Sequence, residues 1–220
     1  MTGGVAGQTV LVTGASRGFG YACARAIGAG GAHVIAVAKT VGGLEDLDDE
    51  IQRAGGSATL VPLDICDDDG LARMGAALYQ RFGKVDTWLH TACHAPPLSP
   101  VEHADAKDLD KTIAVNIRAF QRLIRVVDPL LRLAPAPHAI IAADPRSGDK
   151  FFGAYGMSKA AQSALTRSWG AESGTKISIT EHTPPPMPTA LRARFFPGED
   201  RARLTPCDAA AADLMEILSA

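Results

Sequence analysis

Tyr155 and Lys159 lie four positions apart in the stretch YGMSK, and on a helix this spacing puts both side chains on one face. A tyrosine with a pKa of about 10 is a poor acid–base group at neutral pH. A nearby ammonium favours the phenolate and lowers that pKa. We therefore interpret the pair as a tyrosine prepared for proton transfer. The alternative is a packed helix aromatic beside a solvated lysine.

A second chemical feature is the glycine-rich turn in TVLVTGASRGFG, where Gly14, Gly18 and Gly20 separate an apolar run from a helical one. Glycines let the backbone turn tightly and approach a pyrophosphate, and the following helix offers free N–H groups at its positive end. The spacing is GxxxGxG, whereas GxGxxG is commoner. Its place at the first strand of an alternating chain favours dinucleotide binding over a turn that only packs helix on strand.

The next apolar run, HVIAVAKT, indicates which dinucleotide this turn binds. An NAD enzyme usually ends its second strand in an acidic residue that takes the ribose 2′-hydroxyl. Here the run ends in Ala38 and Lys39. A lysine attracts a 2′-phosphate, and Arg17 in the glycine turn offers a second cation. We therefore predict NADP(H) rather than NAD(H). The alternative is that Lys39 and Arg17 are both ordinary solvated surface residues.

The elements that position these residues alternate regularly along the chain. Near-continuous apolar runs are typical of strands covered on both faces, and their alternation with helical segments predicts a parallel α/β sheet of the Rossmann-like, doubly wound type. The expected strands are 8–13, 33–38, 57–63, 85–90, 138–143 and 176–181; the expected helices are 18–29, 43–54, 67–82, 105–133, 151–173 and 206–218. The stretch TPPPMP after the last strand is expected to be an irregular loop at the ligand-binding edge.

Composition excludes several classes of protein. The 220 residues suit one domain, expected over 1–220, and the formal net charge of −2 argues against nucleic-acid or lipid binding. The four cysteines are scattered, so we expect reduced thiols in the cytoplasm and neither a disulfide framework nor a metal site. No apolar run approaches the roughly 20 residues of a membrane span, and the first residues lack the pattern of a signal peptide.

Four motifs in register give the chain a resemblance to a known family. TGASRGFG, LDI, VN and YGMSK fall in the order and spacing of the short-chain dehydrogenase/reductase family, over about residues 5–218. The resemblance implies a Rossmann-like sheet and NAD(P)-dependent hydride transfer to or from a small carbonyl or alcohol. With no seventh strand before the end of the sequence, it implies six strands in the order 3-2-1-4-5-6.

The resemblance also implies roles for individual residues. Asn116, Tyr155 and Lys159 would carry the catalytic work, with a buried, satisfied asparagine as the open alternative for Asn116. The implied cofactor-binding residues are Thr13, Gly14, Ser16, Arg17, Gly18 and Gly20 in the turn, Lys39, Asp64 and Ile65 toward the adenosine, and Thr91, Ala92, Tyr155, Lys159, Pro184 and Thr189 toward the nicotinamide.

The sequence departs from the family pattern at three places. Ala142 stands where a serine usually helps to polarise the carbonyl, and losing such a donor costs about 10²–10³ in rate. Asp144 or Ser147 could substitute, Ser147 being chemically better suited, although both also fit an ordinary turn. Asn-Ala-Gly is replaced by Thr-Ala-Cys at 91–93. The next residue, His94, could be an alternative proton donor or an ordinary loop histidine.

Pro-Gly after the sixth strand is replaced by a proline run. The loop therefore cannot bind the nicotinamide carboxamide in the usual way unless it shifts.

The segment at about 184–205 falls where the family has its substrate lid. Its arginines could hold an acidic substrate, or could form the solvated face of an amphipathic lid helix. The missing seventh strand favours a homodimer through helices 105–133 and 151–173, with a tetramer as the alternative.

The leading hypothesis is therefore an oxidoreductase that transfers hydride between NADP(H) and a carbonyl or alcohol. The alternative is a catalytically impaired dinucleotide-binding protein that acts as a redox sensor or partner subunit. A purely structural dimer is a third hypothesis, which the glycine turn opposes.

Overall fold

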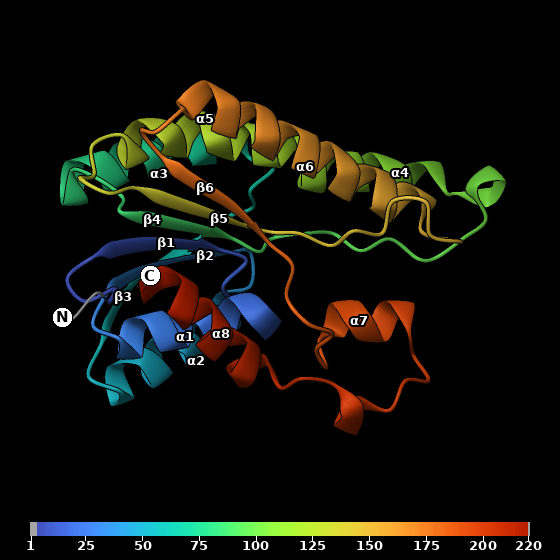
Figure 1. The fold of residues 1–220 in the computed structure, drawn as a ribbon, viewed down its shortest axis with the longest axis horizontal. Helices are drawn as coiled ribbons and strands as arrows, with labels where there is room; N and C mark the ends of the chain where they lie inside the picture. The colour runs from blue at the N-terminus through green and yellow to red at the C-terminus, as the bar shows by residue number, and fades with distance from the viewer. Residues whose placement is uncertain (1–3, 220) are drawn as a thin grey trace.

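Six short apolar segments form one parallel sheet in the computed structural model, which describes residues 4–219 (Figure 1). Residues 1–3 and 220, at the ends of the expected domain, lie outside the described residues. The strands are β1 (Thr9–Thr13), β2 (His33–Ala38), β3 (Ser57–Pro62), β4 (Thr87–His90), β5 (His138–Ala142) and β6 (Ser178–His182). Their order is β3-β2-β1-β4-β5-β6, which confirms the predicted topology.

Helices cover both faces of this sheet (Figure 1). One layer contains α1 (Gly18–Ala29), α2 (Val41–Arg53) and α8 (Cys207–Ser219). The other layer contains α3 (Asp68–Phe82), α4 (Ala106–Ile113), α5 (Phe120–Leu131) and α6 (Gly153–Ser173). The short helix α7 (Ala190–Phe195) lies apart from both layers, beyond the carboxyl ends of the strands. Among the helices of residues 4–219, none combines the length and apolar character needed to cross a membrane.

The continuous apolar character of the strands follows from this double cover. In β1, Val10 and Val12 belong to the core cluster under α1, α2 and α8, whereas Leu11 belongs to the cluster on the opposite face. All three side chains are fully buried. Successive side chains of a strand point to opposite faces, so a strand buried on both sides needs apolar residues at every position.

Two helical expectations need correction. The single helix expected over 105–133 is divided into α4, a π-helical turn η2 (Ala114–Ala119) and α5. The helix expected from residue 151 begins at Gly153, because Phe151 has a φ of 70°, which is incompatible with an α-helix. The lid segment is mostly irregular, with α7 and a short 3-10 turn η3 (Arg201–Arg203) as its only helical pieces among the described residues.

The strand register brings four chain segments to one edge of the sheet. Thr13 is paired with His90, His90 with Ile141, and Ala142 with His182. The loops after β1, β4, β5 and β6 therefore leave the sheet side by side at its carboxyl edge. Ligands of open α/β sheets bind at this edge.

Candidate active site

A cleft of about 1000 Å³ opens at the carboxyl edge of the sheet, between the strand-end loops and α7. This volume is at the upper end of the range for small-molecule sites. Most of the predicted site residues line it: Gly14, Ser16, Arg17, Gly18, Gly20, Lys39, Asp64, Ile65, Thr91, Ala92, Tyr155, Lys159, Pro184 and Thr189. Thr13 and Asn116 do not line it.

The glycine turn joins β1 to α1 at one end of the cleft. Gly14 has a φ of 91°, and a Cβ at this position would lie 2.6 Å from the backbone nitrogen of Ala92, so both conformation and space require glycine. Arg17 is the N-cap residue of α1 and provides no side-chain cap to the helix. The amino end of α1 therefore lacks a side-chain acceptor, an arrangement that a phosphate group can complete.

The two predicted phosphate-binding cations differ in their surroundings. Lys39 Nζ donates a hydrogen bond of 2.7 Å to Asp64 Oδ2, and this bond lowers the pKa of the Asp64 carboxyl. Part of the Lys39 charge is thereby balanced. Arg17 is exposed, lines the same cleft and makes no ion pair with any residue in the described range 4–219. The charge of Arg17 is thus more available to a phosphate than the charge of Lys39.

Tyr155 is 2% exposed, and its phenol points into the cleft from the first turns of α6. Its Oη donates a hydrogen bond of 3.1 Å to Asp144 Oδ2. Burial raises the pKa of Tyr155 above its usual value, and the nearby Cys93 and Asp144 raise it further. The prediction of a lowered pKa was therefore wrong for this structure, because desolvation and a carboxylate both disfavour the phenolate.

Lys159 lines the same cleft but is bonded away from Tyr155. Its Nζ donates a hydrogen bond of 2.6 Å to the carbonyl oxygen of Ala142 and another to Oε1 of Gln162. Burial lowers the pKa of Lys159. Neither of these bonds involves Tyr155, so Lys159 does not lower the pKa of Tyr155 through a direct contact as expected. Sequence reasoning missed Gln162, although its position three residues after Lys159 puts it on the same helical face.

Asn116 is fully buried in the π-helical turn η2. Its Oδ1 accepts a hydrogen bond of 2.6 Å from the His94 backbone nitrogen, and its Nδ2 donates to the His94 carbonyl and to Ser158 Oγ, each at 2.9 Å. The amide oxygen and nitrogen of Asn116 both have hydrogen-bond partners, as in the alternative of a buried, satisfied asparagine. Asn116 holds the loop after β4 against α6 and thereby shapes the floor of the cleft.

Thr13 and Thr91 connect the ends of β1 and β4 beneath the cleft. Thr13 is fully buried, and its Oγ1 lies 2.8 Å from Nδ1 of His90 and accepts a bond of 3.2 Å from Trp88 Nε1. Thr91 Oγ1 donates to the Thr13 carbonyl at 2.9 Å. The side chain of Thr13 therefore fixes the strand end and has no access to a ligand.

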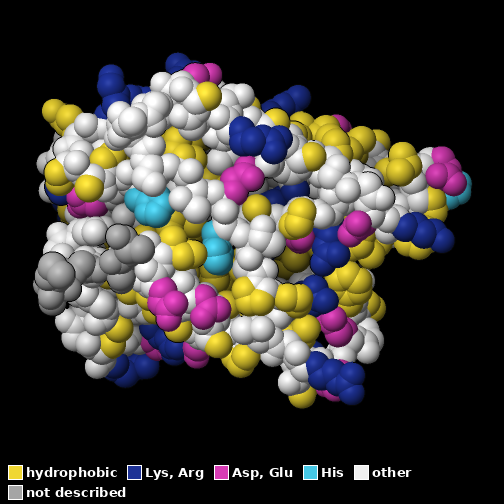
Figure 2. Space-filling view, in the orientation of Figure 1, with side chains coloured by type: hydrophobic (Ala, Val, Ile, Leu, Met, Phe, Trp, Pro, Cys, Tyr) yellow, Lys and Arg dark blue, Asp and Glu magenta, His cyan; other side chains and the backbone are white. Residues whose placement is uncertain are grey.

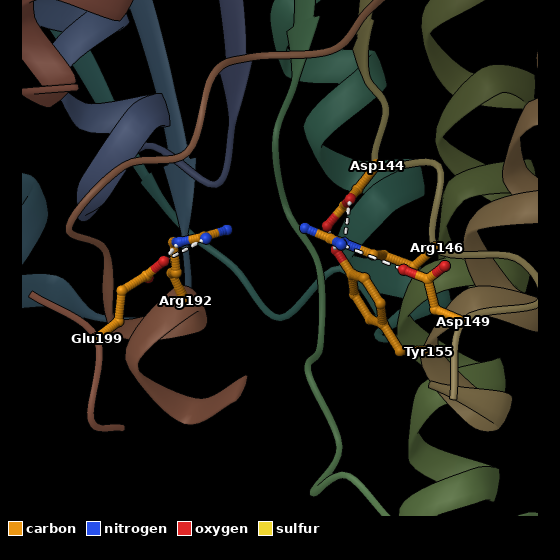
Figure 3. Close-up of polar contacts among 6 residues, drawn as sticks. All are labelled: Asp144, Arg146, Asp149, Tyr155, Arg192 and Glu199. Carbon is orange, nitrogen blue, oxygen red and sulfur yellow. Dashed lines mark hydrogen bonds and ion pairs between the residues drawn. The ribbon is translucent and has the colours of Figure 1, made fainter. Parts of the chain in front are cut away.

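Asp144 is the side chain that meets Tyr155, whereas Ser147, the chemically preferred substitute for the absent serine, lies outside the residues that line the cleft. Arg146 Nε donates to Asp144 Oδ1 at 3.1 Å, and Arg146 Nη1 donates to Asp149 Oδ2 at 3.2 Å (Figure 3). Ser147 thus fits the ordinary turn residue that was its alternative, and Arg146 of the same turn lines the cleft instead.

The lid covers the opposite side of the cleft. The proline run Pro184–Pro186 lines it, and Thr189 caps α7 by accepting a hydrogen bond of 3.2 Å from the Arg192 backbone nitrogen. A Cβ on Gly18 would lie 3.3 Å from Cγ2 of Thr189, so the start of the lid rests over the glycine turn. Arg192 forms a bidentate pair with Glu199, both N···O distances being 2.6 Å.

A glycine turn at a helix end and a buried phenol in one cleft are the features of a dinucleotide-binding α/β enzyme fold. The family model for the short chain dehydrogenases matches residues 8–200. The chain therefore belongs to the short-chain dehydrogenase family, as the motifs predicted.

Two curated relatives agree with this assignment. The chain is 31% identical over 193 residues to the short-chain dehydrogenase/reductase FrzI of a Cladobotryum species, covering 84% of this chain and 73% of FrzI. It is also 31% identical over 193 residues to a fatty acyl-CoA reductase of Acinetobacter baylyi, covering 86% of this chain and 65% of that protein. The chain thus spans about two thirds to three quarters of the length of these relatives.

Two solved structures share the fold over almost their whole length. A Pseudomonas syringae protein ascribed to the short chain dehydrogenases superposes with a TM-score of 0.92 at 28% identity, covering 99% of this chain and 90% of that chain. A metagenomic short-chain oxidoreductase in complex with NADP superposes with a TM-score of 0.82 at 27% identity, covering 98% and 91%.

Proposed function

We propose that this protein is an oxidoreductase that transfers hydride between NADP(H) and the carbonyl or alcohol group of a small molecule. The observation that carries the proposal is that Tyr155 and Lys159 line the same cleft as the glycine turn. A proton-transferring side chain and a phosphate-binding turn in one cavity are what hydride transfer to a carbonyl requires.

The residues of the cleft fit a dinucleotide phosphate. The uncapped amino end of α1 and the glycine turn would hold the pyrophosphate. Arg17 and Lys39 would hold the 2′-phosphate, which favours NADP(H). The solved relative in complex with NADP supports this preference. The remaining contacts would come from Ser16, Asp64, Ile65, Thr91, Ala92, Pro184 and Thr189.

Tyr155 would move the proton in this reaction. The nicotinamide, when bound, supplies the hydride that forms the new C–H bond. The carbonyl oxygen would take its proton from Tyr155 Oη; the raised pKa keeps this phenol protonated at neutral pH but also makes it a weaker acid than a free tyrosine. Lys159 would hold the cofactor ribose, and Asn116 would act as a positioning residue through the loop at His94.

The competing proposal is a dinucleotide-binding protein with little activity. The alanine at 142 and the proline run at 184–186 favour it, since both remove polar contacts that the family pattern places at the reacting group. The presence of both Tyr155 and Lys159 in the cleft opposes it.

Assembly and location belong to the same proposal. Along the outer face of α6, exposed Ala160, Ala164 and Ala171 follow Met157, which is 40% exposed. Small residues on an exposed helix allow close approach of a second helix, so we propose a homodimer through α5 and α6. The free cysteines fit a reducing compartment, and we propose the cytoplasm. The segment at 184–205 would act as the lid over the substrate.

Titration of the purified protein with NADPH and with NADH, followed by nucleotide fluorescence, is the first test. We expect NADPH to bind at least about tenfold more tightly, since a charge-assisted phosphate contact contributes about 1.5–3 kcal/mol. A panel of aldehydes and ketones then reports turnover. NADPH binding without turnover would favour the impaired protein, and binding of neither nucleotide would reject the proposed cofactor.

A further inference from the structure

The charge of the cleft is opposite to the charge of the whole chain. The chain carries a formal net charge of −2, yet seven of the cleft-lining residues are Lys or Arg and two, Asp64 and Asp144, are acidic; Asp149 and Glu199, outside the lining, pair with Arg146 and Arg192. Arg17 and Lys39 lie near the glycine turn and suffice for a nucleotide phosphate. The other cations of the lining are Lys111 in α4, Arg146 in the loop after β5, Arg192 and Arg194 in α7, and the buried Lys159.

Arg146 and Arg192 reach this outer part of the cleft from opposite walls. Arg146 comes from the loop between β5 and α6, and Arg192 comes from the lid helix α7. In Figure 3 the two guanidinium groups point toward one another from the two sides. Both lie over the ring of Phe196, with guanidinium carbons 5.8 Å and 4.6 Å from its centroid. Each guanidinium group is already paired with carboxylates, so an anion between the two would be an additional ligand.

Both guanidinium groups are held in orientation by carboxylates and keep one terminal nitrogen free of these bonds. Asp144 accepts a hydrogen bond from Nε of Arg146, and Asp149 accepts one from its Nη1. Glu199 accepts hydrogen bonds from Nε and Nη2 of Arg192. The side chains are only 29% and 18% exposed, so water screens them less than it screens surface arginines. A preorganised guanidinium loses little entropy when it binds a carboxylate or phosphate.

His94 supplies an independent sign of an absent partner. Its Nε2 is buried and has no hydrogen-bond partner within residues 4–219. Lys111 and Arg194 lie close enough to lower the pKa of this histidine, although burial is the main cause. Unpartnered buried polar atoms are uncommon and call for an explanation. A polar ligand near Lys111 and Arg194 would provide one.

We propose that the outer part of the cleft binds an anionic group, a carboxylate or a phosphate, of the carbonyl substrate between Arg146 and Arg192. The proposal rests on the proposed function, since it names the substrate class of the same site. Binding of the anion would also draw the lid toward the loop after β5, because its two main ligands come from these two segments. Lys and Arg side chains around the opening beside α7 are visible on the face drawn in Figure 2.

The test compares three probes that share one aldehyde: 4-formylbenzoate, its methyl ester and 4-formylphenyl phosphate. Binding to the full chain is measured by calorimetry, which does not depend on turnover. We expect an anionic probe to bind at least about tenfold more tightly than the ester, in line with a charge-assisted hydrogen bond. The better of the two anions identifies the group. Equal binding of all three probes, or binding of none, would overturn the proposal.

Substitutions locate the preference. The double variant R146Q/R192Q is expected to bind acid and ester equally, whereas R203Q, which removes an exposed lid arginine outside the cleft lining, should keep the wild-type preference. If the double variant does not fold, R192K serves instead and should lose part of the preference, because lysine cannot bind an anion in the same bidentate way. An unchanged preference in a folded R146Q/R192Q would also reject the site.

Failure of the proposed function has a different signature. In that case the anionic probe binds with its preference intact, but no NADPH is consumed. Turnover of the ester at the same efficiency as the acid would support the oxidoreductase activity and reject the anion subsite.

Discussion

Tyr155 and Asp144 share a hydrogen bond of 3.1 Å, in which the phenol donates to a carboxylate from the loop after β5. The carboxylate is itself held by Arg146 at 3.1 Å. A tyrosine in this position is ordered as a neutral donor, and its deprotonated form would face a like charge. The pair therefore keeps Tyr155 in its neutral form at neutral pH.

Replacement of Asp144 by Asn should change the pH dependence of alcohol oxidation. Asp144 is one of the causes that raise the pKa of Tyr155, after burial and Cys93. An amide removes the charge, so the pKa of Tyr155 should fall, and the rise of kcat with pH should move to lower pH. The profile is measured with the alcohol product of a reactive aldehyde. D149N, which alters the other carboxylate on Arg146 but does not touch Tyr155, is the control; an identical shift in both variants would refute the assignment.

Replacement of Arg17 by Ala should weaken NADPH binding more than the corresponding change of Lys39. Arg17 has its whole charge available, whereas Lys39 is already paired with Asp64 at 2.7 Å. We expect a loss of affinity of roughly tenfold or more for R17A, since a charged hydrogen bond contributes about 1.5–3 kcal/mol. NADH serves as the matched ligand without the 2′-phosphate, and its binding should change little. Equal losses for both nucleotides would point to the pyrophosphate instead.

Replacement of Asn116 by Ala should destabilise the fold. The variant leaves the backbone groups of His94 without their partner and removes a bond to Ser158. The expected loss in free energy of unfolding is about 2–4 kcal/mol, measured by urea titration. S163A, which removes a solvent-exposed hydrogen bond from Ser163 Oγ to Glu181, should cost less than about 0.5 kcal/mol. Full stability with lost turnover would instead indicate a direct role in the proton path.

Acid should weaken the protein through His90. Burial lowers the pKa of His90 to about 3, below the unfolded value of about 6.5. Between these values the unfolded state binds a proton that the native state excludes, so the free energy of unfolding falls as pH drops below about 6.5. H90N, whose amide can keep the bond to Thr13, should show a shallower loss between pH 7 and pH 4.5. A slope unaltered by H90N would contradict the prediction.

The sheet could be predicted because its strands are apolar at every position. Val10, Leu11 and Val12 are buried on alternate faces, and only a doubly covered strand needs such a run. The strand order followed from the family resemblance. The residues that line the cleft could also be predicted. Gly14, Thr91 and Ala142 each end or follow a strand, and parallel strands bring these positions to one edge of the sheet.

The bonds among those residues could not be predicted. The contact of Asp144 with Tyr155 depends on the course of the turn at 145–148, which no local pattern specifies. The pair of Lys39 and Asp64 joins the ends of two neighbouring strands across 25 positions of sequence. The engaged state of Asn116 depends on a π-helical turn, and propensities do not distinguish such a turn from an α-helix.

The most direct test of hydride transfer uses NADPH carrying deuterium at the transferable position. The protein is incubated with this nucleotide and the aldehyde panel, and the alcohol products are analysed by mass spectrometry. We predict one deuterium in the product of the wild type. In Y155F turnover should fall by about 10²–10⁴ while NADPH binding is kept. NADPH bound with no deuterium in any alcohol, or equal transfer by Y155F, would contradict the proposal.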